Sequence, residues 1–356
     1  MHSDARLGLD LADWHKVAFF SYGFRPFFLG AAIWAVVSMV LWLLMLSGVL
    51  ELPIAIDIVS WHAHAFLFGY LLACVAGFLL TAVPNWTKRP PIAGGVLAML
   101  FGLWLAGRVA FAMSGLLPPL VVLGVDLAMP AALAGLVVRE IVLAGNWRNL
   151  VVVVMLIVLM TANVVFHLEA MAGEYAATGL GVRLGLAAAV MMIALIGGRI
   201  VPTFTRNWLK KRGEADLPPE MGIYDKICLL ALVLILGLWV AMPEERGSGL
   251  ALLAAGALHL IRLARWRGMR TYGEPLVWVL HAGYVFIPLG ALALGAAVLV
   301  PDLVPPPTAQ HLWMAGAIGM MTLAVMTRAS LGHTGRVLTA GSATMAVYLS
   351  LIDRSS

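Results

Sequence analysis

Charged residues are scarce in this chain. Only 12% of its 356 residues are Asp, Glu, Lys or Arg, and 62% are hydrophobic, whereas a soluble domain carries about 25% charged residues. The mean hydropathy is +0.96, and apolar runs of about 20 residues recur from one end of the sequence to the other. These values argue against a soluble protein with an unusually apolar core and indicate an integral membrane protein.

Signals of several other functions are also missing. Cys74 and Cys228 both fall inside apolar runs without a Cys-x-x-Cys pair, so we interpret them as small core residues. The sequence has no Gly-x-x-x-x-Gly-Lys-Ser/Thr loop, which argues against nucleotide-driven transport. We also expect no carboxylates deep inside the apolar runs, where ordinary proton-coupled transport would need them. The N-terminal residues show no short apolar core with a cleavage site, so no signal peptide is expected.

The apolar runs predict helices, because the strands of a membrane barrel would alternate in hydropathy. Eleven runs are candidates to cross roughly 30 Å of hydrocarbon, the last of them being marginal in length. They cover residues 27–48, 61–83, 93–113, 118–138, 149–167, 180–204, 224–242, 249–266, 275–300, 309–328 and 336–352. We therefore predict an all-α, polytopic membrane bundle of about 11–12 transmembrane helices, forming a single integral-membrane domain over residues 1–356.

Basic residues predict the orientation of these helices. With a cytoplasmic N-terminus, lysine and arginine fall on the inner side at every loop, and the outer turns carry mainly acidic residues. The net charge of +5 is therefore a topology signal and gives no indication of nucleic-acid binding.

A repeat of four helices is a further possibility. The second, sixth and tenth spans end on the inner side with similar segments, spaced about 120 residues apart. These segments lie at residues 81–86, 201–208 and 325–330. Chance likeness is the alternative, because helices often stop at proline with basic residues beyond.

Histidines mark the candidate site, because ionisable residues inside a membrane are costly and neutral imidazole is a common ligand of heme, copper and iron. The candidate metal ligands are His62, His64, His167, His259, His281, His311 and His333. The predicted topology puts His62, His64, His167 and His311 near the outer surface and His259 near the midplane. Each histidine taken singly is equally well an interfacial polar residue, and it is their clustering that favours heme or metal binding.

The stretch Trp61-His62-Ala63-His64 opens the second span. On a helix, His62 and His64 point about 200° apart, so they would not share one porphyrin face. A row of small residues lies beside His62 and consists of Ala65, Gly69, Ala73 and Gly77. Such a row lets a flat group approach, although packing of another helix is its commoner use. His64 would then serve a second centre with His167 or His311, and if residues 61–64 are not helical both histidines could bind one copper.

A second site is possible on the inner side of the membrane. His281 and His333, with help from His259, would supply its ligands. His333 lies in a glycine-flanked turn at residues 331–336, which could wrap a ligand but is equally an ordinary loop.

Two arginines occupy positions that suit heme propionates. Arg108 follows Leu105-Ala-Gly near the outer side, and Arg199 follows two glycines near the inner side. Snorkelling of both side chains to lipid headgroups explains them equally well. Asn163 lies one helical turn before His167 and could orient that imidazole through a hydrogen bond.

Several motifs of the sequence resemble the NnrS family. They are Gly23-Phe-Arg-Pro-Phe-Phe28, Trp61-His-Ala-His64, Gly77-Phe-Leu-Leu-Thr-Ala-Val-Pro-Asn-Trp86, Gly198-Arg-Ile-Val-Pro202, Thr205-Arg-Asn-Trp208, Leu280-His-Ala-Gly-Tyr284 and Arg328-Ala-Ser-Leu-Gly-His-Thr-Gly-Arg336. The resemblance covers essentially the whole chain. It implies a multi-pass protein of the bacterial inner membrane that contains heme, of the b type, and copper and takes part in the response to nitric oxide. The histidines that match as ligands are His62, His64, His281, His311 and His333.

A redox enzyme is the first functional hypothesis. Such an enzyme would bind nitric oxide or a related small gas at histidine-ligated heme or copper and reduce or otherwise remove it, with electrons from an unidentified donor. The alternative is a non-catalytic sensor of nitric oxide or redox state, or a carrier of heme or copper. A small-molecule transporter, whose histidines bind substrate or protons, is the third hypothesis.

Overall fold

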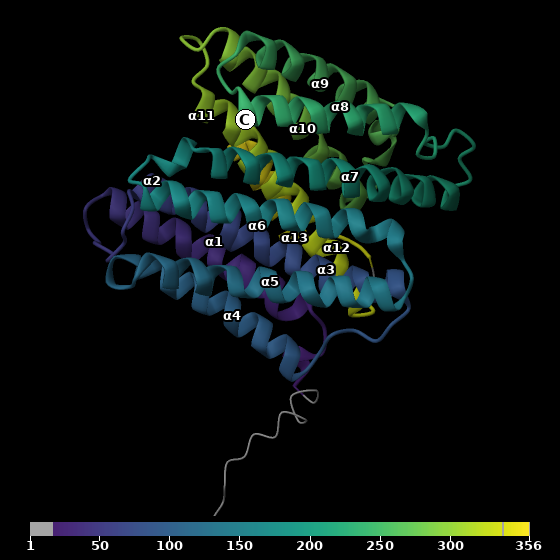
Figure 1. Cartoon of the computed structure of the whole chain (residues 1–356). Coiled ribbons are helices and arrows are strands. Elements are labelled where there is room, and N and C mark those ends of the chain that lie inside the picture. Colours follow the sequence, from purple (N-terminus) through teal and green to yellow (C-terminus); the bar gives the residue numbers. More distant parts are fainter. Residues whose placement is uncertain (1–16, 337, 356) are drawn as a thin grey trace, which may run out of the picture. The chain divides into compact units, whose positions relative to one another are not determined.

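The computed structural model describes residues 17–336 and 338–355, with the side chains of a few residues near the C-terminus left aside. Within that part every regular element is a helix, and ten helical segments are long and apolar enough to cross a membrane (Figure 1). The segments are Phe24–Leu46, Ile58–Thr87, Gly95–Ala112, Pro119–Leu143, Trp147–Met171, Ala176–Lys211, Ile223–Ala241, Arg246–Ala264, Pro275–Leu299 and Pro306–His333. The predicted fold class, an all-α multi-pass membrane bundle, is confirmed.

The end of the chain differs from the expected eleventh span at residues 336–352. Helix α13 (Ser342–Ser355) has 14 residues, which extend about 21 Å at 1.5 Å per residue and fall short of the hydrocarbon thickness. The described part of the chain therefore holds ten candidate spans followed by one shorter helix.

Contacts between residues group the chain into two compact units, Met1–Val182 and Arg183–Ser356. The first unit is built from α1 (Phe24–Leu46), α2 (Ile58–His64), the π-helix η3 (Ala65–Leu71), α3 (Leu72–Thr87), α4 (Gly95–Ala112), α5 (Pro119–Leu143) and α6 (Leu150–Met171). Helix α1 packs on η3 and α3, and α5 packs on α3, α4 and α6. Helix α5 therefore lies at the centre of this unit, in contact with three other spans. The prediction of one domain for the whole chain stays a prediction.

The second unit takes most of α7 (Leu180–Lys211) and the helices that follow. These are α8 (Ile223–Ala241), α9 (Arg246–Ala264), α10 (Pro275–Leu299), α11 (Pro306–His311), the π-helix η8 (Leu312–Met320), α12 (Met321–His333) and α13. Helix α10 packs on α9, η8 and α12, and α8 packs on α9. Helix α10 thus holds the central place in this unit that α5 holds in the first.

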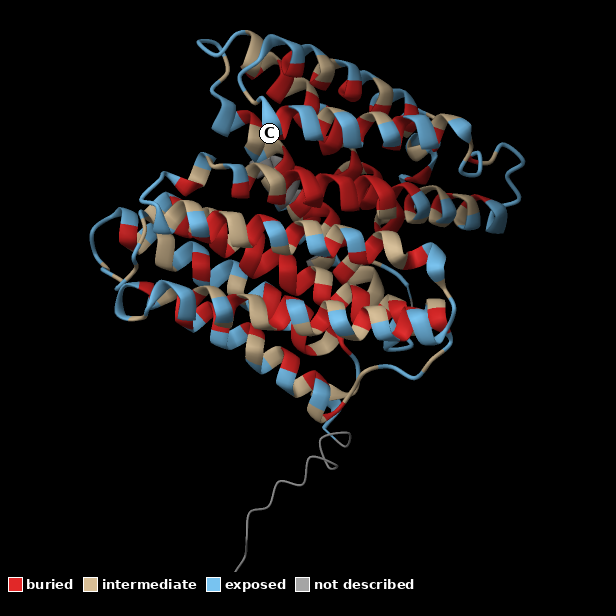
Figure 2. Ribbon diagram, viewed as in Figure 1, coloured by how far each residue is buried: buried red, intermediate tan, exposed pale blue. Residues whose placement is uncertain are grey.

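Many exposed positions on the helices, which are pale blue in Figure 2, carry large apolar side chains. On α1, four aliphatic side chains spaced three or four residues apart are 50% to 65% exposed, namely Ile33, Val36, Val40 and Leu43. A stripe of this kind would be unfavourable in water, and it is the surface that a helix presents to lipid tails. The burial pattern therefore supports the membrane class that composition predicted.

Two spans contain π-helical segments, and each segment directly follows a histidine. His64 ends α2 where η3 begins, and His311 ends α11 where η8 begins. The π-helix is rare and often occurs at functional sites, because its wider turn changes which side chains face a neighbouring helix. The two histidines at these junctions are therefore candidates for a functional role.

Candidate metal centre

His62 and His64 both lie in helix α2, which Asp57 caps at its N-terminus. The carboxylate of Asp57 accepts hydrogen bonds from the backbone N–H of Val59 (3.0 Å) and of Ser60 (2.8 Å), which caps the N-terminus of α2. His62 and His64 consequently point to different surroundings. The His62 ring stacks on Trp42 with centroids 4.1 Å apart, whereas the His64 ring is fully buried. The alternative in which a non-helical stretch lets both bind one copper does not occur.

The row of small residues beside His62 is covered by side chains of α1. Trp34 donates a hydrogen bond from Nε1 to the carbonyl of Ala65 (2.9 Å). A Cβ atom added at Gly69 would lie 2.5 Å from Trp34 Nε1, and one added at Gly77 would lie 2.6 Å from the Phe28 ring. Helix packing therefore fills this row, and no room for a flat cofactor remains along it.

The buried end of His64 meets an aspartate and a second histidine. His64 Nε2 lies 2.9 Å from Asp126 Oδ2, and His167 Nε2 lies 3.2 Å from the same oxygen. The side chains come from α2, α5 and α6, and all three residues are buried. One ligand atom from each lies within 4.8 Å of the other two, a spacing that could hold a metal ion. Two imidazoles and a carboxylate are a donor set that binds first-row transition metals.

Asn163 and Arg108 complete the cluster. Asn163 Nδ2 donates to Asp126 Oδ2 (2.7 Å), and Asn163 Oδ1 lies 3.1 Å from His64 Nε2. Arg108 Nη2 donates to the other carboxylate oxygen, Asp126 Oδ1. Asp126 therefore pairs with the Arg108 guanidinium through Oδ1 and faces the two imidazoles with Oδ2. The predicted orienting role of Asn163 is directed at His64 and Asp126 rather than at His167.

Aromatic rings enclose the cluster. Phe111 stacks on the His64 ring with centroids 3.6 Å apart, and Phe166 lies 5.1 Å from it. His64 Nδ1 is buried without a hydrogen-bond partner. Burial of an imidazole nitrogen without a partner is costly in an apolar surround, and the contacts of this ring with Asp126 and Asn163 are made by its other nitrogen, Nε2.

The expectation that deep carboxylates are absent is wrong for Asp126. This residue lies seven positions into α5, and Arg108 lies four positions before the end of α4. Since α4 and α5 are joined by a short turn and pack together, the two charges reach a similar depth and pair. A lone aspartate inside a predicted span was itself the signal, because an intramembrane carboxylate needs a partner.

The histidines of the second unit are separate from this cluster along the chain, and two of them are buried. His281 Nε2 lies 2.7 Å from Thr205 Oγ1, and a Cβ added at Gly268 would lie 2.6 Å from His281 Nδ1. His259 Nδ1 lies 3.0 Å from the Tyr284 hydroxyl, and its Nε2 lies 3.4 Å from a backbone carbonyl. Protein atoms thus lie against both ring nitrogens of each imidazole.

The remaining predicted site residues lie at the surface of the second unit. His311 is exposed, with Nδ1 2.6 Å from the carbonyl of Pro307. His333 and Arg199 are exposed as well. The structure gives Arg108 a carboxylate partner, whereas the role of Arg199 as a propionate partner stays a prediction. Ligand assignments for His62, His281, His311 and His333 also stay predictions.

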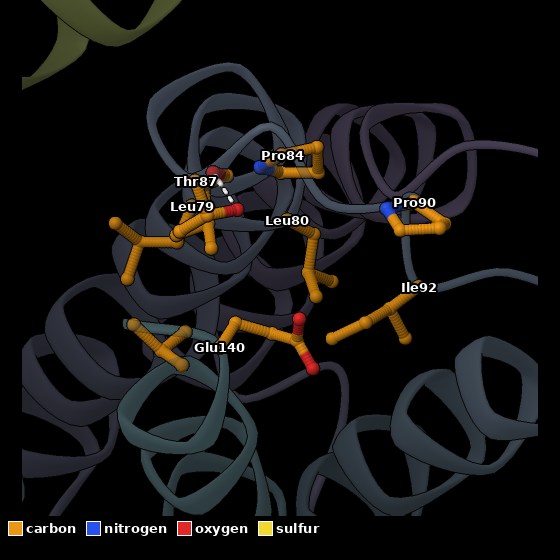
Figure 3. Close-up of a pocket in the computed structure, with 9 residues that line it drawn as sticks. Leu79, Leu80, Pro84, Thr87, Pro90, Ile92 and Glu140 are labelled. Atoms are coloured by element: carbon orange, nitrogen blue, oxygen red, sulfur yellow. Dashed lines mark hydrogen bonds between the residues drawn. The ribbon is translucent and has the colours of Figure 1, made fainter. Parts of the chain in front are cut away.

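A small pocket lies elsewhere in the first unit (Figure 3). Leu80, Pro90 and Ile92 surround the carboxylate of Glu140, which also pairs with Arg89. Glu140 lies about four helical turns beyond Asp126 along α5. The pocket is therefore remote from the histidine cluster and contains none of the predicted ligands.

Comparison with known proteins identifies a family. The family model described as NnrS protein matches residues 18–352, which is nearly the whole chain. No curated protein matches, and no solved structure matches.

Proposed function

The chain belongs to the NnrS family, and on that premise we propose that it is a heme- and copper-binding protein of the bacterial inner membrane that handles nitric oxide. The observation that carries the proposal is the buried cluster of His64, His167 and Asp126. His64, His167 and Asp126 would hold copper there, and copper would supply one-electron chemistry toward a small gas. Removal of nitric oxide by reduction, with electrons from a separate donor, is the proposed activity.

The residues of the cluster fit a transition-metal ion. His64 and His167 bring imidazole nitrogens to the same carboxylate oxygen, and neutral imidazole is a good copper ligand. Asp126 contributes a negative charge at that point, and Asn163 Nδ2 donates to Asp126 Oδ2 and so holds the carboxylate in place. Partners beyond the ligands fix the orientation of metal-binding side chains in this manner.

The remaining side chains of the cluster would keep the site dry and oriented. Phe111 and Phe166 pack on the His64 ring, which excludes water from the imidazole face and strengthens electrostatic interactions inside the site. Arg108 binds Asp126 Oδ1 and leaves Oδ2 directed at the histidines. The cluster is therefore organised before any ion binds.

Heme fits less well where the second unit buries its histidines. Both ring nitrogens of His259 are taken by Tyr284 and a backbone carbonyl, and Gly268 and Thr205 lie against His281. His259 therefore offers no nitrogen to a heme iron in this arrangement, whereas His281 Nδ1 is buried without a hydrogen-bond partner. No step of the proposed activity is assigned to heme, and its ligands are sought among His62, His281, His311 and His333.

The test is metal analysis combined with anaerobic gas consumption. Wild-type protein is purified in detergent, its copper and heme are quantified, and nitric oxide loss is followed with ascorbate and a phenylenediamine mediator as reductant. We expect copper bound at one equivalent or close to it and saturable nitric oxide consumption. The double variant His64→Ala/His167→Ala should lose both, because two of the three ligands are gone.

Three outcomes would contradict parts of the proposal. Consumption no faster than with free heme excludes an enzyme, and spectral shifts on gas binding without turnover would point to a sensor or carrier. Copper content unchanged in the double variant excludes this cluster as the copper site. Protein from heme-replete cells that lacks Soret absorption excludes heme and favours a transporter.

A further inference from the structure

The charges of the cluster cancel before any ion binds. Arg108 and Asp126 are 4% and 2% exposed, respectively, and they form an ion pair. The two imidazoles add no charge when they act as ligands, since only neutral imidazole binds a metal. The surround of α4, α5 and α6 is apolar. A bound ion therefore brings its whole charge into the membrane interior without compensation.

Arg108 is held in place beside the ligands. Its Nη2 binds Asp126, and its guanidinium carbon lies 6.0 Å from the centre of the Trp34 ring. Its Nη1 occupies the space that Gly69 leaves open, because a Cβ there would lie only 2.6 Å from that nitrogen. The guanidinium is enclosed on three sides. Its positive charge is thus a permanent part of the site.

This positive charge affects monovalent and divalent ions differently. Repulsion between Arg108 and a bound ion grows in proportion to the charge of the ion. The cost of burying a net charge grows faster still, because it depends on the square of the charge. With a monovalent ion bound, the net charge of the cluster is +1. With a divalent ion bound, the net charge is +2. Arg108 therefore penalises divalent ions more.

We infer that Arg108 sets the metal selectivity of this centre, making it prefer monovalent copper to Zn²⁺ and Fe²⁺. The inference rests on the proposed function, in which His64, His167 and Asp126 hold copper. Two histidines and one carboxylate without such an arginine suit divalent iron or zinc. Arg108 changes that preference, because its positive charge offsets the negative charge of Asp126 that would otherwise stabilise a divalent ion.

The same charge acts on the reduction potential of bound copper. Reduction lowers the charge of the ion by one, which relieves repulsion from Arg108. The arginine therefore raises the potential and keeps the ion in the reduced form. Reduced copper is the form that would donate an electron to a bound gas, so selectivity and redox state have one structural cause.

Two single substitutions should move the selectivity in opposite directions. Arg108→Met leaves the carboxylate uncompensated, and we expect the ratio of Cu⁺ affinity to Zn²⁺ affinity to fall by about 10- to 100-fold. Asp126→Asn leaves the arginine uncompensated and should raise that ratio by about tenfold or more. Arg108→Lys keeps a positive charge beside Asp126 and is the matched control, with a ratio within about threefold of wild type because the repulsion depends on charge.

The measurement is competition in detergent between a Cu⁺ chelator and Zn²⁺ on the folded, monodisperse fraction of each variant. A redox titration of the copper-loaded protein gives a second readout. For a one-electron couple each tenfold change in the relative affinity of Cu²⁺ and Cu⁺ is about 59 mV. A fall of about 60–120 mV in the Arg108→Met variant is therefore expected.

Folding failure is separated from loss of selectivity by a double variant. Arg108→Met/Asp126→Asn leaves no buried charge uncompensated, and its ratio should return to within about tenfold of wild type. Equal loss of Cu⁺ and Zn²⁺ affinity in both single variants, with an unchanged ratio and potential, would overturn the inference and leave Arg108 a structural residue. Wild-type protein that binds no copper would instead overturn the proposed function, so the two failures are distinguishable.

Discussion

A buried arginine–aspartate pair occurs in each unit, and the two pairs serve different surroundings. In the first unit Arg108 binds Asp126, whose second oxygen meets two imidazoles and an amide. In the second unit Arg262 binds Asp225 (2.9 Å), the carbonyl of Ala194 (3.1 Å) and the Tyr284 hydroxyl (2.8 Å). Both units thus contain the same kind of ion pair, but the contacts of the nearby histidines differ between them.

The histidine of the second unit takes part in a closed hydrogen-bond chain. Arg262 can only donate, so the Tyr284 hydroxyl accepts from it and donates to His259 Nδ1. The proton of His259 then lies on Nε2, 3.4 Å from the carbonyl of Cys228. Both ring nitrogens of His259 and the Tyr284 hydroxyl therefore have partners in this chain. In the first unit, nitrogen and oxygen atoms that can bind a metal converge on one point. In the second unit, the polar groups are linked one after another by hydrogen bonds, an arrangement that stabilises helix packing.

The largest predicted effect is on copper affinity, which should fall when a histidine of the first unit is replaced and not when His259 of the second unit is replaced. His64→Ala or His167→Ala removes a ligand, and we expect copper affinity to fall by more than the roughly 10–100-fold typical of losing an orienting partner. His259→Ala, in the closed network, should change copper affinity by less than about threefold. Titration with a competing Cu⁺ chelator measures both. Comparable losses in the two clusters would contradict the distinction.

Stability should depend strongly on the pair of the second unit. Arg262→Met removes the 2.9 Å partner of the buried Asp225 carboxylate, which keeps Arg265 at 3.8 Å and the backbone N–H of Gly222 at 3.1 Å. We expect a loss of about 2–3 kcal/mol in the free energy of unfolding. Unfolding in detergent, followed by circular dichroism, gives the value. Added copper should leave it unchanged, and a loss below about 1 kcal/mol would show that the pair is not buried in the folded protein.

The guanidinium groups of Arg108 and Arg262 each lie against a glycine. Substituting these two glycines gives a matched pair of variants with smaller expected effects. A Cβ at Gly198 would lie 2.2 Å from Arg262 Nη2, as one at Gly69 would lie 2.6 Å from Arg108 Nη1. Gly198→Ala and Gly69→Ala should each cost about 1–3 kcal/mol of stability through overpacking. Only Gly69→Ala should also alter copper binding.

Glycines in open space are the controls for those two variants. Gly102 in α4 and Gly237 in α8 have no atoms within 4 Å of an added Cβ. Alanine at either position should be neutral or stabilise by up to about 1 kcal/mol, because alanine favours the helix. Thermal unfolding of the four variants side by side tests the set, and similar losses in all four would show that the arginine contacts are not responsible.

Among the variants that remove a contact, the smallest effect is expected from Tyr284→Phe. Loss of the hydroxyl removes one acceptor from Arg262 and one donor from His259, with an expected cost of about 1–2 kcal/mol. Copper affinity should not change. A large loss of bound copper in this variant would mean that the second unit also contributes to the metal site.

Part of the candidate site was predictable from residue types alone. His64 and His167 were candidates because imidazoles are rare in membrane spans, and the 200° separation of His62 and His64 follows from helix geometry. Asp126 is not among the predicted ligands, although a charge in the middle of an apolar run demands a partner. Its contact with His64, 62 positions away in the chain, could not be read from local spacing.

Composition and periodicity by themselves determined the membrane class, the helical secondary structure and the approximate span limits. These properties depend on the transfer of each segment into hydrocarbon and on backbone hydrogen bonds that close within the segment, so no long-range contact is needed. Tertiary structure alone decided which polar groups meet. The packing of α5 on α4 and α6 brings Arg108, Asp126 and His167 together, and equally placed histidines elsewhere were left at the surface or closed into hydrogen-bond networks.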